Sequence, residues 1–239
     1  MAKPSPRPPV AGPPLIRALA PFGQHPYTTD PLDLPATLGG WVDWNRAVAL
    51  ARALDGPAAA PAEAPDAAPP SSPGPPRTLE SLEQEATRAR QSHADAIDAL
   101  LGGLEGPQPP DAAELQRLHA TLQRGQLAST GRLRGQLRDL LATVDTQGAR
   151  LAAIDEVMEH ALAPREYRLL DALPARLGTH VAAARVPPAT ADAAPADPGD
   201  PASLPWPASL RDNVRDLLQA ELDLRFLPID GLLAALRQH

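Results

Sequence analysis

The chain has 239 residues, a formal charge of −7 and no cysteine. The negative charge argues against a general binder of polyanions, and the lack of cysteine excludes disulfides, thiol catalysis and zinc sites built on cysteine. Aromatic residues make up only 3% of the chain, so a core must be built from Leu, Ala, Val and Ile.

The 31 prolines are distributed unevenly. Their clusters mark where regular structure stops. They predict a disordered tail over 1–14, a Pro/Ala-rich disordered linker over 56–77 and a second disordered linker over 186–205. The first residues lack the apolar core of a signal peptide, and no window is long and apolar enough to span a bilayer. We therefore expect a cytoplasmic protein without membrane insertion.

The segment 15–55 predicts a small N-terminal group of helices. LIRALAPF is typical of one short helix that ends at Pro21, and a further helix start is expected at Asp33. A last helix of this segment should run to about Leu54. Trp41 and Trp44 are expected to close this group as packed rings, in preference to stacking on a base or a ligand.

The segment 78–185 predicts a helical bundle with a long antiparallel hairpin. Thr78 can cap a first long helix that ends near residue 104, and a second should run from about 111 to 145. Three glycines in the second helix predict a bend or break near 125–131, because each weakens a helix by about 1 kcal/mol relative to Ala: Gly125, Gly131 and Gly135. Pro164 should begin a new helix, and Pro174 should kink or restart it.

The segment 206–239 predicts a helix, a corner and a short helix. Pro228 should end the first helix near Leu227, and Asp230 should cap the second. Glu221 and Arg225 are four residues apart and are expected to pair on the solvent side.

An all-α fold therefore follows from the pattern, since no long segment alternates with period two. The Leu/Ala stripe from Leu79 to Leu104 needs a partner surface. Either the second long helix covers it within the chain or another copy does, which makes a homo-oligomer one expectation.

The sequence also resembles a known family. The segments RLAAIDEVMEHALAPREYRLLDALPARL and LLQAELDLRFLPIDGLLAALR, with the early WVDW, are similar to an uncharacterised proteobacterial family of about this length, a domain of unknown function. The resemblance brings no catalytic motif and no site residues. It implies a cytoplasmic accessory subunit of an envelope-associated assembly.

Candidate chemistry is sparse. Glu156, Glu159 and His160 form the one acidic cluster around a histidine at helical spacing, and Glu156 and His160 could share a metal from one helix face. A solvated polar face is the simpler interpretation, since no HExxH pattern is present. His93 is expected to be packed or to face a partner. We predict no catalytic, cofactor-binding or metal-binding residues and no cofactor.

A second candidate is an arginine face on the helix that spans 111–145. Five arginines make this helix locally basic, and three of them, Arg117, Arg124 and Arg138, fall near one face if the helix is continuous; the other two are Arg132 and Arg134. No aromatic residues are interleaved with them, so nucleic acid is not the expected partner. The leading hypothesis is a non-enzymatic helical adaptor with an unknown protein partner. The alternatives are an enzyme at Glu156, Glu159 and His160, or a nucleic-acid-associated regulator that uses the arginine face.

Overall fold

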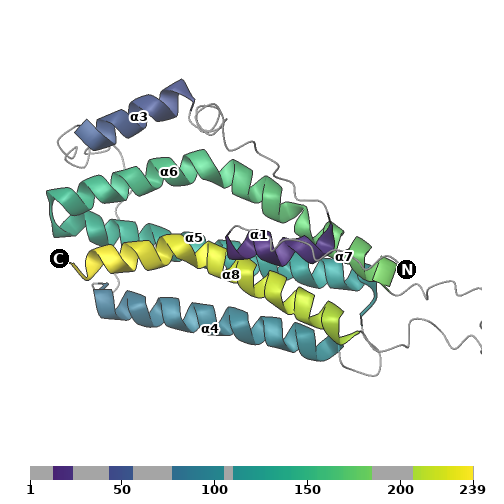
Figure 1. Cartoon of the computed structure of the whole chain (residues 1–239). Helices are drawn as coiled ribbons and strands as arrows, with labels where there is room; N and C mark the ends of the chain where they lie inside the picture. Colours follow the sequence, from purple (N-terminus) through teal and green to yellow (C-terminus); the bar gives the residue numbers. More distant parts are fainter. Residues whose placement is uncertain (1–12, 24–42, 56–76, 105–109, 185–206, 239) are drawn as a thin grey trace, which may run out of the picture. The chain divides into compact units, whose positions relative to one another are not determined.

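The computed structural model describes residues 13–23, 43–55, 77–104, 110–184 and 207–238. Within these ranges the regular structure is entirely helical, which confirms the predicted all-α bundle (Figure 1). The elements are α1 (Pro14–Leu19), η1 (Ala20–Phe22), α3 (Trp44–Asp55), α4 (Leu79–Leu104), α5 (Ala112–Val144), α6 (Thr146–Asp171), α7 (Leu173–Ala184) and α8 (Ala208–Leu236). Asp33 and Trp41 lie outside the described ranges, as do nearly all residues of the predicted tail and linkers.

Side-chain caps set the first residue of several helices. The predicted cap at Thr78 is confirmed: the Ser81 N–H donates to Thr78 Oγ1 over 3.2 Å, and the Thr78 N–H donates to Ser81 Oγ over 3.1 Å. Such a reciprocal cap satisfies two of the N–H groups that a helix start leaves without an intrahelical acceptor. Three aspartates accept the equivalent hydrogen bond at the starts of α3, α5 and α6: Asp43, Asp111 and Asp145.

The chain divides into two compact units. Unit one comprises the described parts of 1–28, 94–122 and 172–224, and unit two those of 29–93, 123–171 and 225–239. α1, η1 and α7 belong to unit one, whereas α3 and α6 belong to unit two. α4, α5 and α8 contribute residues to both. The predicted segments 15–55, 78–185 and 206–239 are each continuous in the sequence, whereas each unit combines three stretches of the chain. These predicted domain boundaries stay predictions.

Unit one has a core of aliphatic side chains. α1 contributes Leu15 and Leu19, each only 4% exposed. The Phe22 ring meets His180 of α7 edge-on, with 4.8 Å between the ring centroids. The remaining buried leucine, isoleucine and valine residues come from the end of α4, the start of α5, α7 and α8: Ile97, Leu100, Leu101, Leu104, Leu115, Leu173, Leu177, Val181, Leu210, Val214, Leu217, Leu218 and Leu222.

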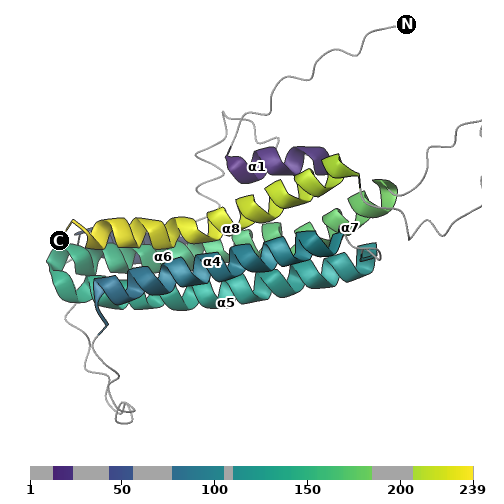
Figure 2. The same cartoon turned by 90° about the horizontal axis from the view of Figure 1, so that it is seen from below.

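In unit two, neighbouring helices run antiparallel. Arg90 of α4 binds Asp230 of α8 over 2.6 Å. Glu83, which lies closer to the start of α4, binds Arg237 over 2.6 Å. The residue number falls on α4 as it rises on α8, which is the signature of an antiparallel pair. Figure 2 shows these parts of α4 and α8 side by side with α5 and α6.

The turn between α5 and α6 depends on one glycine. Asp145 alone separates the two helices, and its Oδ1 accepts a hydrogen bond from the Gly148 N–H over 2.7 Å. A Cβ at position 148 would collide with the backbone oxygen of Leu141. Glycine therefore allows the backbones of α5 and α6 to approach closely at the turn.

The predicted break near 125–131 is wrong, because α5 is one helix from Ala112 to Val144. Its interior face continues through the glycine region with the polar residues Gln126 and Thr130, both buried, before Leu133. Tertiary packing outweighs the low helix propensity of glycine here. Leu118 lies off this interior face, since it is 41% exposed.

Pro164 and Pro228 lie inside α6 and α8, so the predicted new start at Pro164 and the corner at Pro228 are wrong. Phe226 and Ile229, on either side of Pro228, are both buried in unit two. Their packing holds the helix together although proline removes one helical hydrogen bond. Asp230 is not a cap, because it lies within α8 and pairs with Arg90. Pro174 does follow a break, as predicted: a turn at Ala172 separates α6 from α7.

Two further expectations are resolved. The α4 stripe is buried within each unit, with Leu82 and Ala86 in unit two and Ile97 and Leu104 in unit one. The described residues therefore cover the stripe without another copy. Trp44 does not close a packed cluster, because 81% of its surface is exposed.

Candidate functional site

An open hollow of about 520 Å³ lies between the first turns of α6 and the last turns of α8, within unit two. Leu151, Ile154 and Ala235 line it with apolar surface. Polar side chains complete the lining: Thr146, Gln147, Arg150 and Gln238. Its volume is in the range of small-molecule and side-chain pockets, and its lining combines apolar contact with a few hydrogen-bonding groups.

α6 makes contacts on two sides, only one of which faces α5. Ile154, which lines the hollow, lies away from the side that faces α5. Gly148, Asp155 and Glu159 face α5, as their contacts show. On a helix with 3.6 residues per turn, Ile154 and Ala161 lie on the opposite side. Ala161 is only 2% exposed, so this second side of α6 is also covered at that position.

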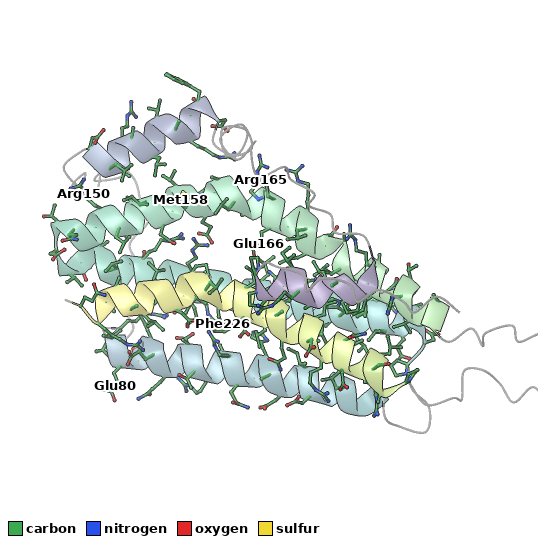
Figure 3. All side chains as sticks on the ribbon, viewed as in Figure 1. Glu80, Arg150, Met158, Arg165, Glu166 and Phe226 are labelled. Atoms are coloured by element: carbon green, nitrogen blue, oxygen red, sulfur yellow. The ribbon has the colours of Figure 1, made fainter. Side chains whose placement is uncertain are left out.

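α3 covers part of this second side of α6 (Figure 1). The Arg150 guanidinium donates a hydrogen bond to the backbone oxygen of Leu54, in the last turn of α3. Figure 3 shows Arg150 on the side of α6 toward α3. A helix leaves its last carbonyl groups without intrahelical donors, and a cation there is favourable. Arg150 therefore links the rim of the hollow to the end of α3.

The charged side chains between α5 and α6 bind one another. Asp155 receives two hydrogen bonds from Arg134, of 2.7 and 2.8 Å, and pairs with Arg138 at 3.3 Å. Glu159 also binds Arg138. Burial lowers the pKa of Arg138, but the hydrogen bond to Glu159 and the nearby negative charges outweigh this, so the net pKa is raised. The guanidinium stays charged, and the cluster ties α5 to α6.

The predicted acidic cluster does not converge. Glu159 turns toward the arginines of α5. His160 is exposed, and its Nδ1 binds the backbone oxygen of Glu156 over 2.8 Å, within its own helix. In the described part of the chain, no three histidine and carboxylate side chains gather in a way that could hold a metal ion.

The predicted arginine face is not a continuous basic surface. Arg134 and Arg138 are bound to acidic residues of α6, and Arg132 pairs with Glu85 of α4 at 3.2 Å. Arg117 and Arg124 are exposed but belong to different units.

The predicted solvent-side location of Glu221 and Arg225 is wrong, because both side chains are buried. Glu221 is 1% exposed and lies in unit one, where its Oε2 accepts a hydrogen bond from His119 Nε2 over 2.8 Å. Arg225 is 8% exposed and lies in unit two, 3.8 Å from Glu166. Both residues occupy the interior face of α8. Figure 3 shows Glu166 on α6 and Phe226 on the α4 side of α8.

The sequence does not single out His119, because no acidic residue of the same helix lies three or four positions from it. A signal was present for its partner: Leu210, Val214, Leu217 and Glu221 are spaced by four, three and four residues, which places the glutamate on the apolar stripe. His119 likewise follows the buried Leu115 by four residues. Its Nδ1 is buried and has no hydrogen-bond partner among the described residues.

His93 is packed, as expected. The Ser129 hydroxyl donates to the Gln126 backbone oxygen over 3.1 Å, so it accepts from His93 Nε2–H over 2.6 Å. Burial and the positive charge of Arg225 lower the pKa of His93. The neutral imidazole is therefore the favoured form in unit two.

A model of a protein family of unknown function, DUF3348, matches residues 1–238. The chain belongs to the DUF3348 family. The resemblance seen in the sequence to an uncharacterised family is confirmed. No curated protein and no solved structure matches this DUF3348 chain. Among its described helices, none has the apolar length that a membrane crossing requires.

Membership of DUF3348 assigns no residue a role. The hollow and the surroundings of His93 and His119 therefore rest on geometry alone. Of these, the hollow is the feature that offers an accessible apolar surface, whereas His119 and Glu221 are enclosed in the core of unit one.

Proposed function

We propose that the protein is a non-enzymatic helical adaptor that binds a partner protein through the hollow between α6 and α8. The observation that carries the proposal is an open, mainly apolar concavity in a unit whose charged side chains largely bind each other. Interfaces between proteins combine such an apolar centre with a polar rim.

The lining specifies the chemistry of the partner. Leu151 and Ile154 can take up one or two aliphatic or aromatic side chains from a helix or loop. Gln147 and Gln238 at the rim can exchange hydrogen bonds with the partner backbone, since an amide both donates and accepts. Leu151 is 38% exposed, so its burial by a partner would contribute favourable hydrophobic free energy.

The proposal includes a cytoplasmic setting and an accessory role in an envelope-associated bacterial assembly. The support for both is the family resemblance of the sequence. The two alternatives lack an observation in their favour. Glu159 and His160 bind in different directions, and three of the five arginines that make α5 locally basic pair with carboxylates.

A variant-controlled capture experiment tests the proposal. The tagged full chain, its Leu151→Glu variant and a Leu227→Glu control are each used to capture proteins from an extract of the source organism, with identification by mass spectrometry. Leu227 is 61% exposed and lies on α8 without lining the hollow. A protein recovered with the wild type and with the control, but lost with Leu151→Glu, is expected.

The captured protein is then purified and titrated against each variant. A charge placed in an apolar contact should weaken binding at least ~10-fold, because an unpaired charge must be desolvated. Equal affinity for the wild type and Leu151→Glu would contradict the proposal.

A further inference from the structure

The side of α3 that faces away from α6 carries an exposed aromatic ring. α3 buries none of its residues completely. At 100° per residue, Trp44, Val48 and Arg52 lie along one side of the helix, because each follows the previous one by four residues. Trp44 and Arg52 are exposed, and Val48 between them is half-buried, as is Ala47. The other half-buried residues, Arg46, Ala49, Leu50 and Ala53, centre on the opposite side, and we assign that side to α6.

α3 thus carries apolar residues on the side that packs against α6 and, with Trp44 and Val48, on the other side as well. A helix with this pattern usually lies between two layers. Exposed large apolar groups beside polar ones frequently mark interaction surfaces. The outer side of α3 (Trp44, Val48, Ala51 and Arg52) is therefore a surface with room for a second helix.

We propose that the outer side of α3 binds the same side of α3 in a second copy of the chain, with the two helices antiparallel about a two-fold axis at Val48. Trp44 and Arg52 lie four residues before and four residues after Val48. A two-fold axis at that residue brings Arg52 of each copy to Trp44 of the other. A guanidinium over an indole ring is attractive, and the contact occurs twice.

This self-complementarity favours a second copy over an unrelated helix. A two-fold contact requires that a surface match itself, and here the aromatic ring and the cation are equidistant from one residue. The other arginine of α3, Arg46, already pairs with Asp43 at 3.2 Å, which leaves Arg52 as the α3 arginine on the outer side. Antiparallel helices also place opposite ends of their dipoles side by side.

The dimer should be weak and concentration-dependent. α3 has 12 residues, which corresponds to a length of about 18 Å. Two such helices bury less than a standard stable interface. The α4 stripe, for which the sequence predicted either the second long helix or another copy as the partner, is buried within the chain. The inferred contact thus goes beyond the proposed binding of a different protein at the hollow.

Sedimentation of the full chain over a range of concentrations tests the dimer. A reversible monomer–dimer equilibrium is expected for the wild type. Trp44→Gln should remain monomeric, and Arg52→Gln should weaken dimerisation by about 5- to 30-fold through the loss of two cation–π contacts. Leu227→Gln removes another exposed apolar residue, on α8, and should leave the equilibrium unchanged. All three positions are exposed, and unchanged helical circular dichroism verifies folding.

The absence of native cysteine allows a second measurement. A single Val48→Cys substitution places two thiols opposite each other at the axis, so mild oxidation should yield a covalent dimer. Leu227→Cys should stay monomeric under the same conditions. A wild-type chain that is monomeric up to about 1 mM would overturn the inference.

Two other outcomes would also overturn it. A dimer that persists in Trp44→Gln would have to use another surface. A monomeric chain whose Trp44 is needed for capture of a different protein would assign the outer side of α3 to that protein. Neither outcome affects the Leu151→Glu test of the hollow, so failure of one proposal is distinguishable from failure of the other.

Discussion

His119 of α5 and Glu221 of α8 form a hydrogen-bonded pair of 2.8 Å in the core of unit one, and each is only 1% exposed. Removal of one member of a buried pair leaves the other polar group in an apolar environment. Glu221→Ala is therefore expected to reduce the free energy of unfolding by about 3–5 kcal/mol, at the upper end of the range for core substitutions. Urea midpoints of the wild type and variant measure this loss.

The double variant His119→Leu/Glu221→Leu provides the control. It replaces both polar groups by apolar ones, so it should be less destabilised than Glu221→Ala. If Glu221→Ala costs less than about 1 kcal/mol, the carboxylate is exposed in solution and the pair does not form.

Gly148→Ala should destabilise the protein because its methyl group would collide with the backbone of Leu141. Backbone atoms cannot move aside as a flexible side chain can, so a loss of about 1–3 kcal/mol or more is expected. Gly131→Ala is the matched control in α5: a Cβ there meets no atom within 4 Å, and the gain in helix propensity should stabilise by about 0.5–1 kcal/mol. Opposite shifts in urea midpoint verify the prediction, and shifts of the same sign contradict it.

His93 should make stability depend on pH. Its pKa in the folded protein is below the ordinary value of 6.5, owing to burial and to the charge of Arg225. As the pH falls below 6.5, the unfolded chain binds a proton more readily than the folded one, so His93 contributes stability above that pH and loses it on acidification. In His93→Gln this part of the acid sensitivity should vanish.

The readout is the difference in urea midpoint between pH 7.5 and 5.0, compared for the wild type and His93→Gln. Carboxylates titrate in both proteins, so the comparison isolates the histidine. Glutamine can still donate a hydrogen bond to Ser129. Equal acid sensitivity of the two proteins would show that His93 binds its proton equally well in the folded and unfolded states.

Asp155→Ala should cost more than Asp230→Ala. Asp155 is largely buried and holds both Arg134 and Arg138, whereas Asp230 and its partner Arg90 are half exposed. We expect a loss of about 1–3 kcal/mol for the first and ~0–1 kcal/mol for the second. Thermal or urea unfolding at low and high salt tests this order, and salt should reduce only the smaller effect. Equal losses would mean that solvent screens both pairs alike.

The sequence by itself determined the features that depend on neighbouring residues. The cap at Thr78, the helix start at Asp111 and the break before Pro174 all appear where the sequence predicts them. In each case a side chain or a proline ring acts on a backbone group within four residues, so no distant contact is needed. The all-α class follows from the same local periodicity.

Only the tertiary structure decided whether a helix continues through residues of low helix propensity. Pro228 and the glycines of α5 disfavour a helix locally, but Phe226, Ile229 and Leu133 keep an apolar face in phase around them and are buried. The free energy of that burial exceeds a penalty of about 1 kcal/mol per glycine or ~3 kcal/mol for the proline. Propensity alone predicted breaks at both places.

The pairing of charged residues was also beyond the sequence. Glu221 binds His119, which is 102 residues away in the sequence. Helical spacing could show that Glu221 shares a stripe with Leu217, but not which side chain faces it across the core. Similarly, Trp44 carries an apolar ring that composition assigns to a core, yet it is exposed on α3. The packing of helices that are distant in the sequence determines which side chains meet. That packing depends on many contacts, and no single segment of the sequence contains them all.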